Sequence, residues 1–238
     1  MREEEIEVAG LRVVSVGEPE DAAQVVILLH GFTMTPRDLS PFAHAMRHPA
    51  WFLFPEGPLA AEPGGRAWWH IDAAKREAAL TLGPRDFAEQ HPVDLPIARR
   101  RLADLMTALA PRIGSRPLFL GGFSQGAMLS CDTVLRTTFP LAGLVLLSGS
   151  RIAWSEQEAL FARAQERLRG LPTFVSHGRT DADLSFEAGT ALKDALVAAG
   201  ADVTWLPFEQ GHEIPLVVWR TLRKMLVASL ACRESSAS

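Results

Sequence analysis

The chain has 238 residues, 47% of them hydrophobic and 22% charged, and its formal net charge is −4 at pH 7. This composition is sufficient for a sizeable core, and the negative charge argues against binding to a nucleic-acid backbone. With only two cysteines, Cys131 and Cys232, a disulfide framework is not expected, and no apolar run approaches the ~18 residues that a membrane span needs.

The first half of the chain predicts three strands and two helices. Residues 11–16, 25–29 and 51–54 are apolar strand segments, and a helical pattern covers 37–46. A long stretch without a regular pattern then extends to about residue 92. Its two tryptophans favour an ordered loop near a functional site, because long loops in compact domains are usually functional or disordered. Helical spacing returns over 94–113.

The second half alternates strands and helices regularly. Strands are predicted at 118–123, 141–147, 172–176 and 203–208, and helices after Ser124 and at 155–168, 185–199 and 214–231. Such alternation predicts an α/β fold, with a mostly parallel sheet covered by helices on both faces. We expect a single domain over 1–238, with flexible ends at about 1–10 and 232–238. About 20 residues separate the strand ending near 148 from the strand at 172, which leaves no room for a cap domain.

The segment from Gly122 to Gly126 predicts a nucleophile elbow. An apolar strand ends in Gly-Phe-Ser-Gln-Gly and passes directly into a helical pattern, so Ser124 would stand on a sharp turn at the carboxyl edge of the sheet. The flanking glycines are needed where a β-carbon would collide with the strand and the helix. The backbone N–H of Gln125 begins the helix and would point at whatever Ser124 attacks.

A serine nucleophile needs a histidine base and a carboxylate that orients it, and both follow strands in this sequence. Of the seven histidines, His212 lies between the last predicted strand and the last helix. Asp181 and Asp183 both come shortly after the strand that ends at 176, and both remain candidates at this point. The resulting chain order of Ser, Asp and His is that of α/β-hydrolases.

Several motifs together resemble the phospholipase/carboxylesterase group of α/β-hydrolases, which includes acyl-protein thioesterases. They are Leu29-His-Gly31, Ala67-Trp-Trp69, Gly122-Phe-Ser-Gln-Gly126, His177-Gly-Arg-Thr-Asp181 and Gly211-His-Glu-Ile214. The resemblance implies an α/β-hydrolase fold, Asp181 rather than Asp183 as the acid, and backbone donors from Phe32 and Gln125 as an oxyanion hole. Separately, Trp68 and Trp69 are candidate substrate contacts, because they lie on the long loop that is expected near the site.

We therefore expect a serine carboxylic-ester hydrolase of carboxylesterase, lysophospholipase or acyl-thioesterase type. Its substrate would be a small-molecule or lipid-like acyl ester or thioester, and no metal or other cofactor is expected. An acidic start without a leader-like apolar region predicts a cytoplasmic protein without integral membrane association, and a homodimer is left open. Two alternatives remain: a non-catalytic binding module on the same fold, or a serine hydrolase of peptides or polar esters.

Overall fold

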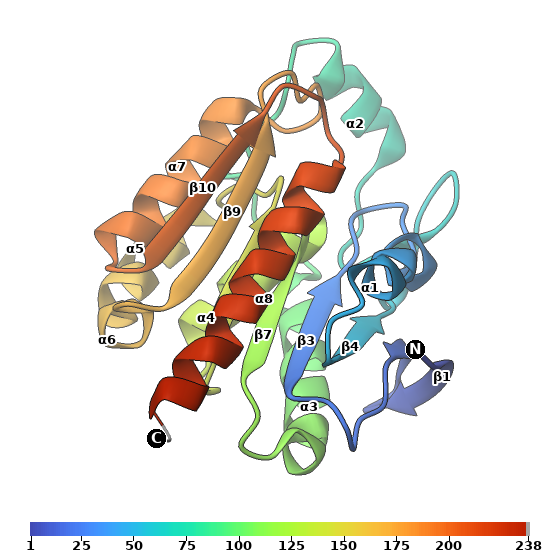
Figure 1. Cartoon of the computed structure of the whole chain (residues 1–238). Helices are drawn as coiled ribbons and strands as arrows, with labels where there is room; N and C mark the ends of the chain where they lie inside the picture. The colour runs from blue at the N-terminus through green and yellow to red at the C-terminus, as the bar shows by residue number, and fades with distance from the viewer. Residues whose placement is uncertain (237–238) are drawn as a thin grey trace.

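A computed structural model describes residues 1–236 of the chain, with side chains described through residue 231. Its main feature is an eight-stranded sheet in the order β1-β2-β4-β3-β7-β8-β9-β10 (Figure 1). The six strands β4, β3, β7, β8, β9 and β10 run parallel to one another, whereas β1 pairs antiparallel with β2 and β2 pairs antiparallel with β4. The strands of this sheet are β1 Glu3–Val8, β2 Leu11–Val16, β3 Gln24–Leu29, β4 Ala50–Pro55, β7 Leu118–Phe123, β8 Gly143–Leu147, β9 Pro172–Gly178 and β10 Asp202–Phe208.

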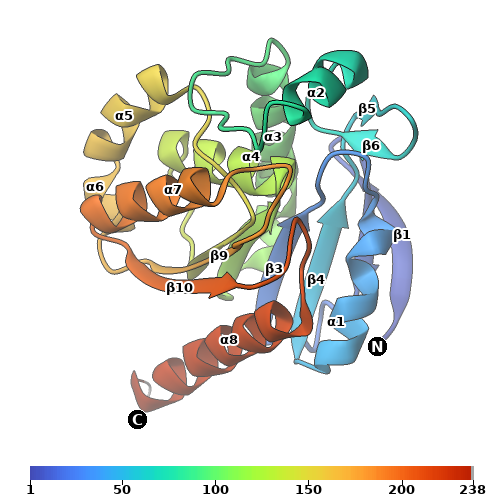
Figure 2. The same ribbon diagram turned by 90° about the horizontal axis from the view of Figure 1, so that it is seen from above.

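Helices cover both faces of the sheet, as the alternating pattern predicts. In the view from above, α1 and α8 lie on one side and α3, α4, α5, α6 and α7 on the other (Figure 2). Their bounds are α1 Ser40–Met46, preceded by the short η1 Pro36–Asp38, α2 Ala73–Leu80, α3 Leu95–Ile113, α4 Gln125–Arg136, α5 Trp154–Arg163, α6 Gln165–Leu168, α7 Phe186–Ala198 and α8 Leu216–Ser236.

The central strands are apolar along their whole length because each is buried on both faces. Every residue of β3, β4 and β7 is buried, as expected for parallel strands under two helix layers. Successive side chains of β3 alternate between two cores: Val25 and Ile27 pack with the α3 and α4 layer, and Val26 and Leu28 pack with α1 and α8. This double coverage explains why continuous apolar runs, rather than alternating patterns, mark the strands in the sequence.

The expectation of a flexible end at residues 1–10 is wrong. Strand β1 pairs with β2 along its whole length, and Glu3 and Glu5 form ion pairs with Arg37 of η1. A segment in which charged and apolar residues alternate is typical of an edge strand with one solvent-exposed face. In the sequence alone, its many charged residues resemble those of a polar tail. At the other end, the backbone of α8 continues to Ser236, and residues 237–238 of the expected flexible end at 232–238 lie outside the described residues.

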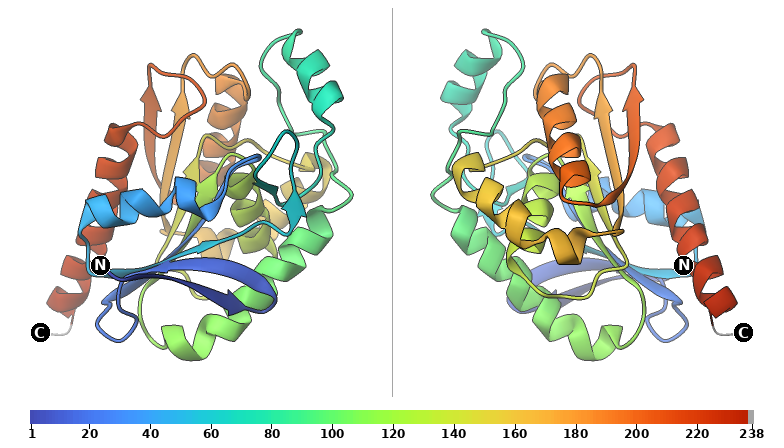
Figure 3. Two further views of the ribbon diagram at one scale, coloured as in Figure 1. Left: turned by 90° about the vertical axis from the view of Figure 1, so that its right-hand side faces the viewer. Right: turned by 90° about the vertical axis from the view of Figure 1, so that its left-hand side faces the viewer.

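The stretch from 59 to 92 is ordered, as predicted, but it is not wholly irregular. It contains a two-stranded hairpin, β5 Leu59–Ala60 with β6 Arg66–Ala67, and then helix α2, whose first turn is capped by the Asp72 carboxylate accepting from the Lys75 N–H at 2.9 Å. The two side views show α2 beyond the end of the sheet toward which the parallel strands point (Figure 3). This segment therefore stands over the edge at which the elbow serine was predicted.

Candidate active site

Ser124 stands on a strained turn between β7 and α4. Its backbone has φ 54° and ψ −115°, a left-handed conformation that is uncommon for a residue with a side chain. The two flanking glycines have no room for a β-carbon: one added at Gly122 would lie 2.5 Å from the carbonyl oxygen of Leu29, and one at Gly126 would lie 2.3 Å from the same oxygen. The turn is therefore the predicted elbow, and it holds Ser124 with only 8% of its surface exposed.

His212 lies in the loop between β10 and α8 and bridges Ser124 and Asp181. Its Nε2 accepts from the Ser124 hydroxyl at 2.9 Å, and its Nδ1–H donates to Oδ2 of Asp181 at 2.7 Å. The imidazole also packs on the ring of Phe123, with the two ring centroids 4.7 Å apart. Three side chains from loops far apart in the sequence thus form one continuous hydrogen-bond chain.

Asp181 is fixed by the turn that follows β9. Its Oδ1 accepts from the backbone N–H groups of Asp183 at 2.8 Å and Leu184 at 2.9 Å, and its Oδ2 faces His212 and, at 3.3 Å, Nε2 of His177. Burial alone would raise the pKa of Asp181, but the hydrogen bonds from His177, His212 and the Leu184 N–H outweigh it and hold that pKa well below its usual range. Asp181 is therefore a buried, charged carboxylate.

The second carboxylate of this turn, Asp183, points elsewhere. It forms ion pairs with Arg76 of α2 and with Arg85, and no hydrogen bond joins it to His212 among the described residues. These two guanidinium groups hold the pKa of Asp183 below its usual range against the opposing effect of burial. The geometry therefore favours Asp181 as the partner of His212.

Phe32 and Gln125 lie beside Ser124 with their backbone N–H groups free. Neither N–H has an acceptor among residues 1–236, and both residues line the cavity that contains Ser124. The loop after β3 is fixed by two backbone hydrogen bonds to Arg66, which accepts from the Thr33 N–H at 3.0 Å and donates to the Met34 carbonyl at 2.9 Å. Two backbone donors therefore border the space over the serine hydroxyl.

The sequence matches the family described as Phospholipase/Carboxylesterase over residues 10–229. The chain belongs to the phospholipase/carboxylesterase family. Among relatives of this family member, acyl-protein thioesterase 1 of Kluyveromyces lactis is 27% identical over 198 residues, which are 77% of this chain and 79% of the relative. The resemblance that the sequence motifs indicated is thus confirmed.

Solved structures confirm the α/β-hydrolase fold of this family member. Acyl-protein thioesterase 2 of Zea mays superposes with a TM-score of 0.73 at 20% identity, covering 92% of this chain and 99% of that one. Esterase PE8 gives a TM-score of 0.68 at 24% identity and covers 90% of this chain and 96% of its own. Family membership and the names of these relatives support a hydrolase that acts on esters or thioesters.

In this phospholipase/carboxylesterase family member, the side chain of Gln125 ties the tryptophan segment to the elbow. Its Oε1 accepts from the Trp68 N–H at 2.7 Å, and its Nε2 donates to the Trp69 carbonyl at 2.9 Å. The indole of Trp68 donates to the His30 carbonyl at 3.0 Å and is only 1% exposed, so it has no surface on which to meet substrate. The prediction that Trp68 contacts substrate is therefore wrong, because this residue packs beneath the loop after β3.

His30 shapes the same loop after β3. Its Nδ1–H donates to the Gly31 carbonyl at 2.7 Å, and its Nε2 accepts from the Gly57 N–H at 2.9 Å. Burial lowers the pKa of His30 to about 4, so this imidazole is neutral in the folded protein at neutral pH. A charged ring could not accept the hydrogen bond from Gly57.

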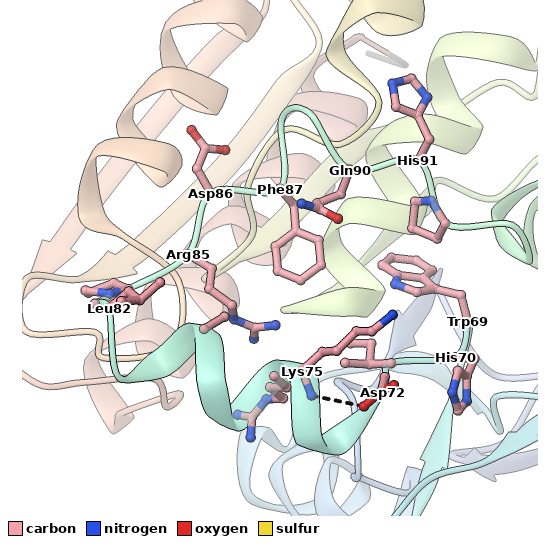
Figure 4. A pocket seen from close by; sticks show the side chains of 16 residues that line it. Trp69, His70, Asp72, Lys75, Leu82, Arg85, Asp86, Phe87, Gln90 and His91 are labelled. Carbon is pink, nitrogen blue, oxygen red and sulfur yellow. Dashed lines mark hydrogen bonds between the residues drawn. The ribbon is translucent and has the colours of Figure 1, made fainter.

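Two connected hollows open above the elbow. The cavity at Ser124 measures about 230 Å³, and a groove of about 570 Å³ adjoins it, sharing Ile71, Arg76, Arg85 and Phe87 with its lining. Trp69 is also only 1% exposed and borders the groove rather than the cavity at Ser124. Helix α2 forms one wall of the groove (Figure 4). Arg76 and Arg85 were not among the site residues predicted from the sequence, because no regular structure was expected between residues 59 and 92.

In the part of the chain that the structure describes, no group of three or more His, Cys, Asp or Glu side chains is arranged to hold a metal ion. Within the same residues, none of the helices is both long and apolar enough to cross a lipid bilayer. Of the two cysteines, Cys131 is buried in α4 as a free thiol, whereas the side chain of Cys232 lies outside the described residues.

Proposed function

We propose that this protein is a serine hydrolase that cleaves carboxylic esters or thioesters through an acyl-enzyme formed on Ser124. The observation that carries the proposal is the hydrogen-bond chain from the Ser124 hydroxyl through His212 to Asp181, with distances of 2.9 Å and 2.7 Å. A serine hydroxyl becomes an effective nucleophile when a base within hydrogen-bond reach can take its proton. A serine that merely starts a helix would need neither partner.

The reaction follows from the orientation of these groups. His212 takes the proton of Ser124 through Nε2 as the hydroxyl oxygen attacks the acyl carbonyl, and the charge of Asp181 stabilises the imidazolium that forms. The imidazolium then protonates the departing alkoxide or thiolate, which leaves an acyl-serine. Water, activated by His212 in the same way, hydrolyses this acyl-enzyme and restores the free hydroxyl.

The backbone N–H groups of Phe32 and Gln125 would stabilise the tetrahedral intermediate. They border the cavity without acceptors of their own, and Gln125 begins α4, so the positive end of the helix dipole lies behind its N–H. Loss of one donor of this kind typically reduces the rate by about 10²–10³. Both donors belong to the backbone, so a side-chain substitution alone does not remove them.

An acyl ester or thioester of small-molecule or lipid-like type fits the surroundings of Ser124. Within the described chain, only α5 and α6 lie between β8 and β9, so no cap domain closes over the site. The wall comes from the α2 segment, through Ile71, Arg76, Arg85 and Phe87. The thioesterase names of the relatives make acyl-thioesters the first substrates to compare with oxygen esters.

The direct test is hydrolysis of 4-nitrophenyl butyrate and of a matched butyryl thioester by the wild type and by Ser124→Ala. We expect turnover by the wild type and none above background by the variant, with unchanged thermal unfolding. Ser155→Ala is a matched control. Ser155 is exposed and does not lie on a nucleophile elbow, although its Oγ lies 3.3 Å from Nε2 of a histidine, His91. A folded Ser124→Ala protein with wild-type turnover would refute the proposal, and so would a wild type without esterase or thioesterase activity.

A further inference from the structure

The cavity at Ser124 contains two guanidinium groups that the proposed chemistry does not use. Arg76 projects from α2 and Arg85 follows that helix, and both line the same cavity as Ser124 and His212. Their side chains are 32% and 15% exposed, so both are partly withdrawn from water. Arginine side chains are costly to bury, which makes a pair of them beside a reactive serine a feature that needs an explanation.

The hydrogen-bonding capacity of this pair is only partly used. Asp183 supplies the one carboxylate that lines the cavity in the described chain, and it contacts a single terminal nitrogen of each guanidinium. The Nε atoms of Arg76 and Arg85 are buried without an acceptor. Each guanidinium offers five N–H donors, so the cavity has a net charge of about +1 and several donors to spare.

The adjoining groove adds one further cation, Lys75, and two carboxylates, Asp72 and Asp86. Lys75 and Arg85 extend into it beside Phe87, and the Arg85 guanidinium carbon lies 4.8 Å from the centroid of that ring (Figure 4). The two carboxylates of the groove lining have other partners. Asp72 caps α2, and Oδ2 of Asp86 lies 3.8 Å from a guanidinium nitrogen of Arg151. Neither neutralises the guanidinium pair.

We propose that the enzyme selects esters or thioesters that carry a carboxylate, and that Arg76 and Arg85 bind this carboxylate while Ser124 attacks the acyl carbon. This inference rests on the proposed function and adds the substrate class. A monoanion would neutralise the residual charge of about +1, and the planar guanidinium matches a carboxylate in a paired geometry. Because Asp183 already orients both side chains, little side-chain entropy remains to be lost on binding.

The test uses two pairs of aryl esters that differ in charge, with hydrolysis followed by release of the phenol. Mono-4-nitrophenyl adipate and its methyl ester place the carboxylate or its neutral counterpart on the acyl side; 4-butanoyloxybenzoate and its methyl ester place them on the leaving group. We expect the wild type to prefer the anionic member of at least one pair by about tenfold in kcat/KM. The preference should shrink when NaCl is raised from about 0.02 M to about 0.5 M, because salt screens the attraction.

Substitutions then assign the preference to the two arginines. Arg76→Gln and Arg85→Gln should each lower the anionic-to-neutral ratio of kcat/KM about fivefold, whereas Arg12→Gln, at an exposed arginine paired with Glu56, should leave the ratio unchanged. If Arg85→Gln does not fold, the decision falls to Arg76→Glu, which should favour the neutral ester, and to the salt dependence of the wild type.

Two results would overturn the inference. One is a wild-type enzyme that hydrolyses neutral and anionic esters equally in both pairs, in which case the proposed hydrolase function still stands. The other is an anionic preference that survives Arg76→Gln and Arg85→Gln together. A wild type that hydrolyses none of the four esters would contradict the proposed function as well, so the two failures are distinguishable.

Discussion

The backbone of Gly178, at the end of β9, packs directly against that of Gly211: a β-carbon added at Gly178 would lie 2.3 Å from the Gly211 carbonyl oxygen. Gly178 precedes the turn that carries Asp181, and Gly211 is followed by His212. Further backbone hydrogen bonds join the two loops, including one from the Arg179 N–H to the Phe208 carbonyl at 2.7 Å. The spacing of the carboxylate and the imidazole therefore depends on a glycine-to-glycine contact.

Substitution of Gly178 by alanine should separate these two loops. The added methyl group must displace backbone rather than a flexible side chain, so we expect kcat on a 4-nitrophenyl ester to fall by at least about tenfold, since a misplacement of about 1 Å can cost about 10²-fold. Gly64→Ala is the matched control, because a β-carbon there meets nothing within 4 Å. Equal kcat values for the two variants would show that the contact does not set the geometry.

The two aspartates of the acid turn should differ sharply in their effect on rate. Asp181→Asn replaces the acceptor of the His212 Nδ1–H, and loss of a triad carboxylate of this kind reduces kcat by about 10⁴. Asp183→Asn weakens ion pairs to Arg76 and Arg85 and should cost far less on a neutral ester. Steady-state kinetics of both variants decide the assignment, and the reverse order would make Asp183 the acid.

Gln125→Ala should destabilise the fold. The substitution removes two hydrogen bonds to buried backbone groups of Trp68 and Trp69 and leaves those groups without partners, at a cost of roughly 2–4 kcal/mol. Urea unfolding should show a lower midpoint with an unchanged slope. Gln165→Ala, at an exposed position on α6, serves as the control and should stay within about 0.5 kcal/mol of wild type. A wild-type midpoint for Gln125→Ala would contradict this role.

Stability should fall with acid because His30 must stay neutral. Burial lowers the pKa of His30 from 6.5 to about 4, so the unfolded chain binds the proton more readily than the folded one in this interval. The contribution is therefore fully present above about pH 6.5 and is lost as the pH falls to about 4, a change of about 3 kcal/mol.

Urea unfolding at pH 7.5 and pH 4.5 measures this effect. In His30→Gln the loss of stability between the two pH values should be smaller than in wild type by most of that amount, because the titrating group is gone. His70→Gln, at an exposed histidine, is the matched control. An identical pH dependence for wild type and His30→Gln would show that His30 is not the group responsible.

The sequence predicted β2, β3, β4 and β7 to β10, the elbow, and the loops that carry Ser124, Asp181 and His212, because these features have local signals. Parallel strands buried on both faces are continuous apolar runs, and the residues that follow their carboxyl ends must meet at one edge of the sheet. Strand positions alone did not distinguish Asp181 from Asp183 as the partner of His212, because both aspartates occupy the same turn. Their side chains are distinguished by long-range partners, His212 on one side and Arg76 and Arg85 on the other.

Two features could not be predicted correctly from the sequence: helix α2 and the burial of Trp68. Helix α2 has a cap at Asp72 and strong helix formers, but none of its residues is buried, so hydrophobic spacing could not reveal it. The prediction that Trp68 contacts substrate rested on the position of an aromatic residue near a site, whereas its burial depends on the contacts of its indole with His30. The burial of Trp68 depends on tertiary packing, which no local sequence pattern shows.

Covalent labelling tests most directly whether His212 activates Ser124. Wild type and His212→Ala would be treated with a fluorophosphonate at pH 8, and the modified peptide identified by mass spectrometry. We expect stoichiometric labelling of Ser124 in the wild type and at least about a 10³-fold slower reaction in the variant. A wild type that remains unlabelled at Ser124, or a His212→Ala variant that reacts as fast as wild type, would contradict the central claim.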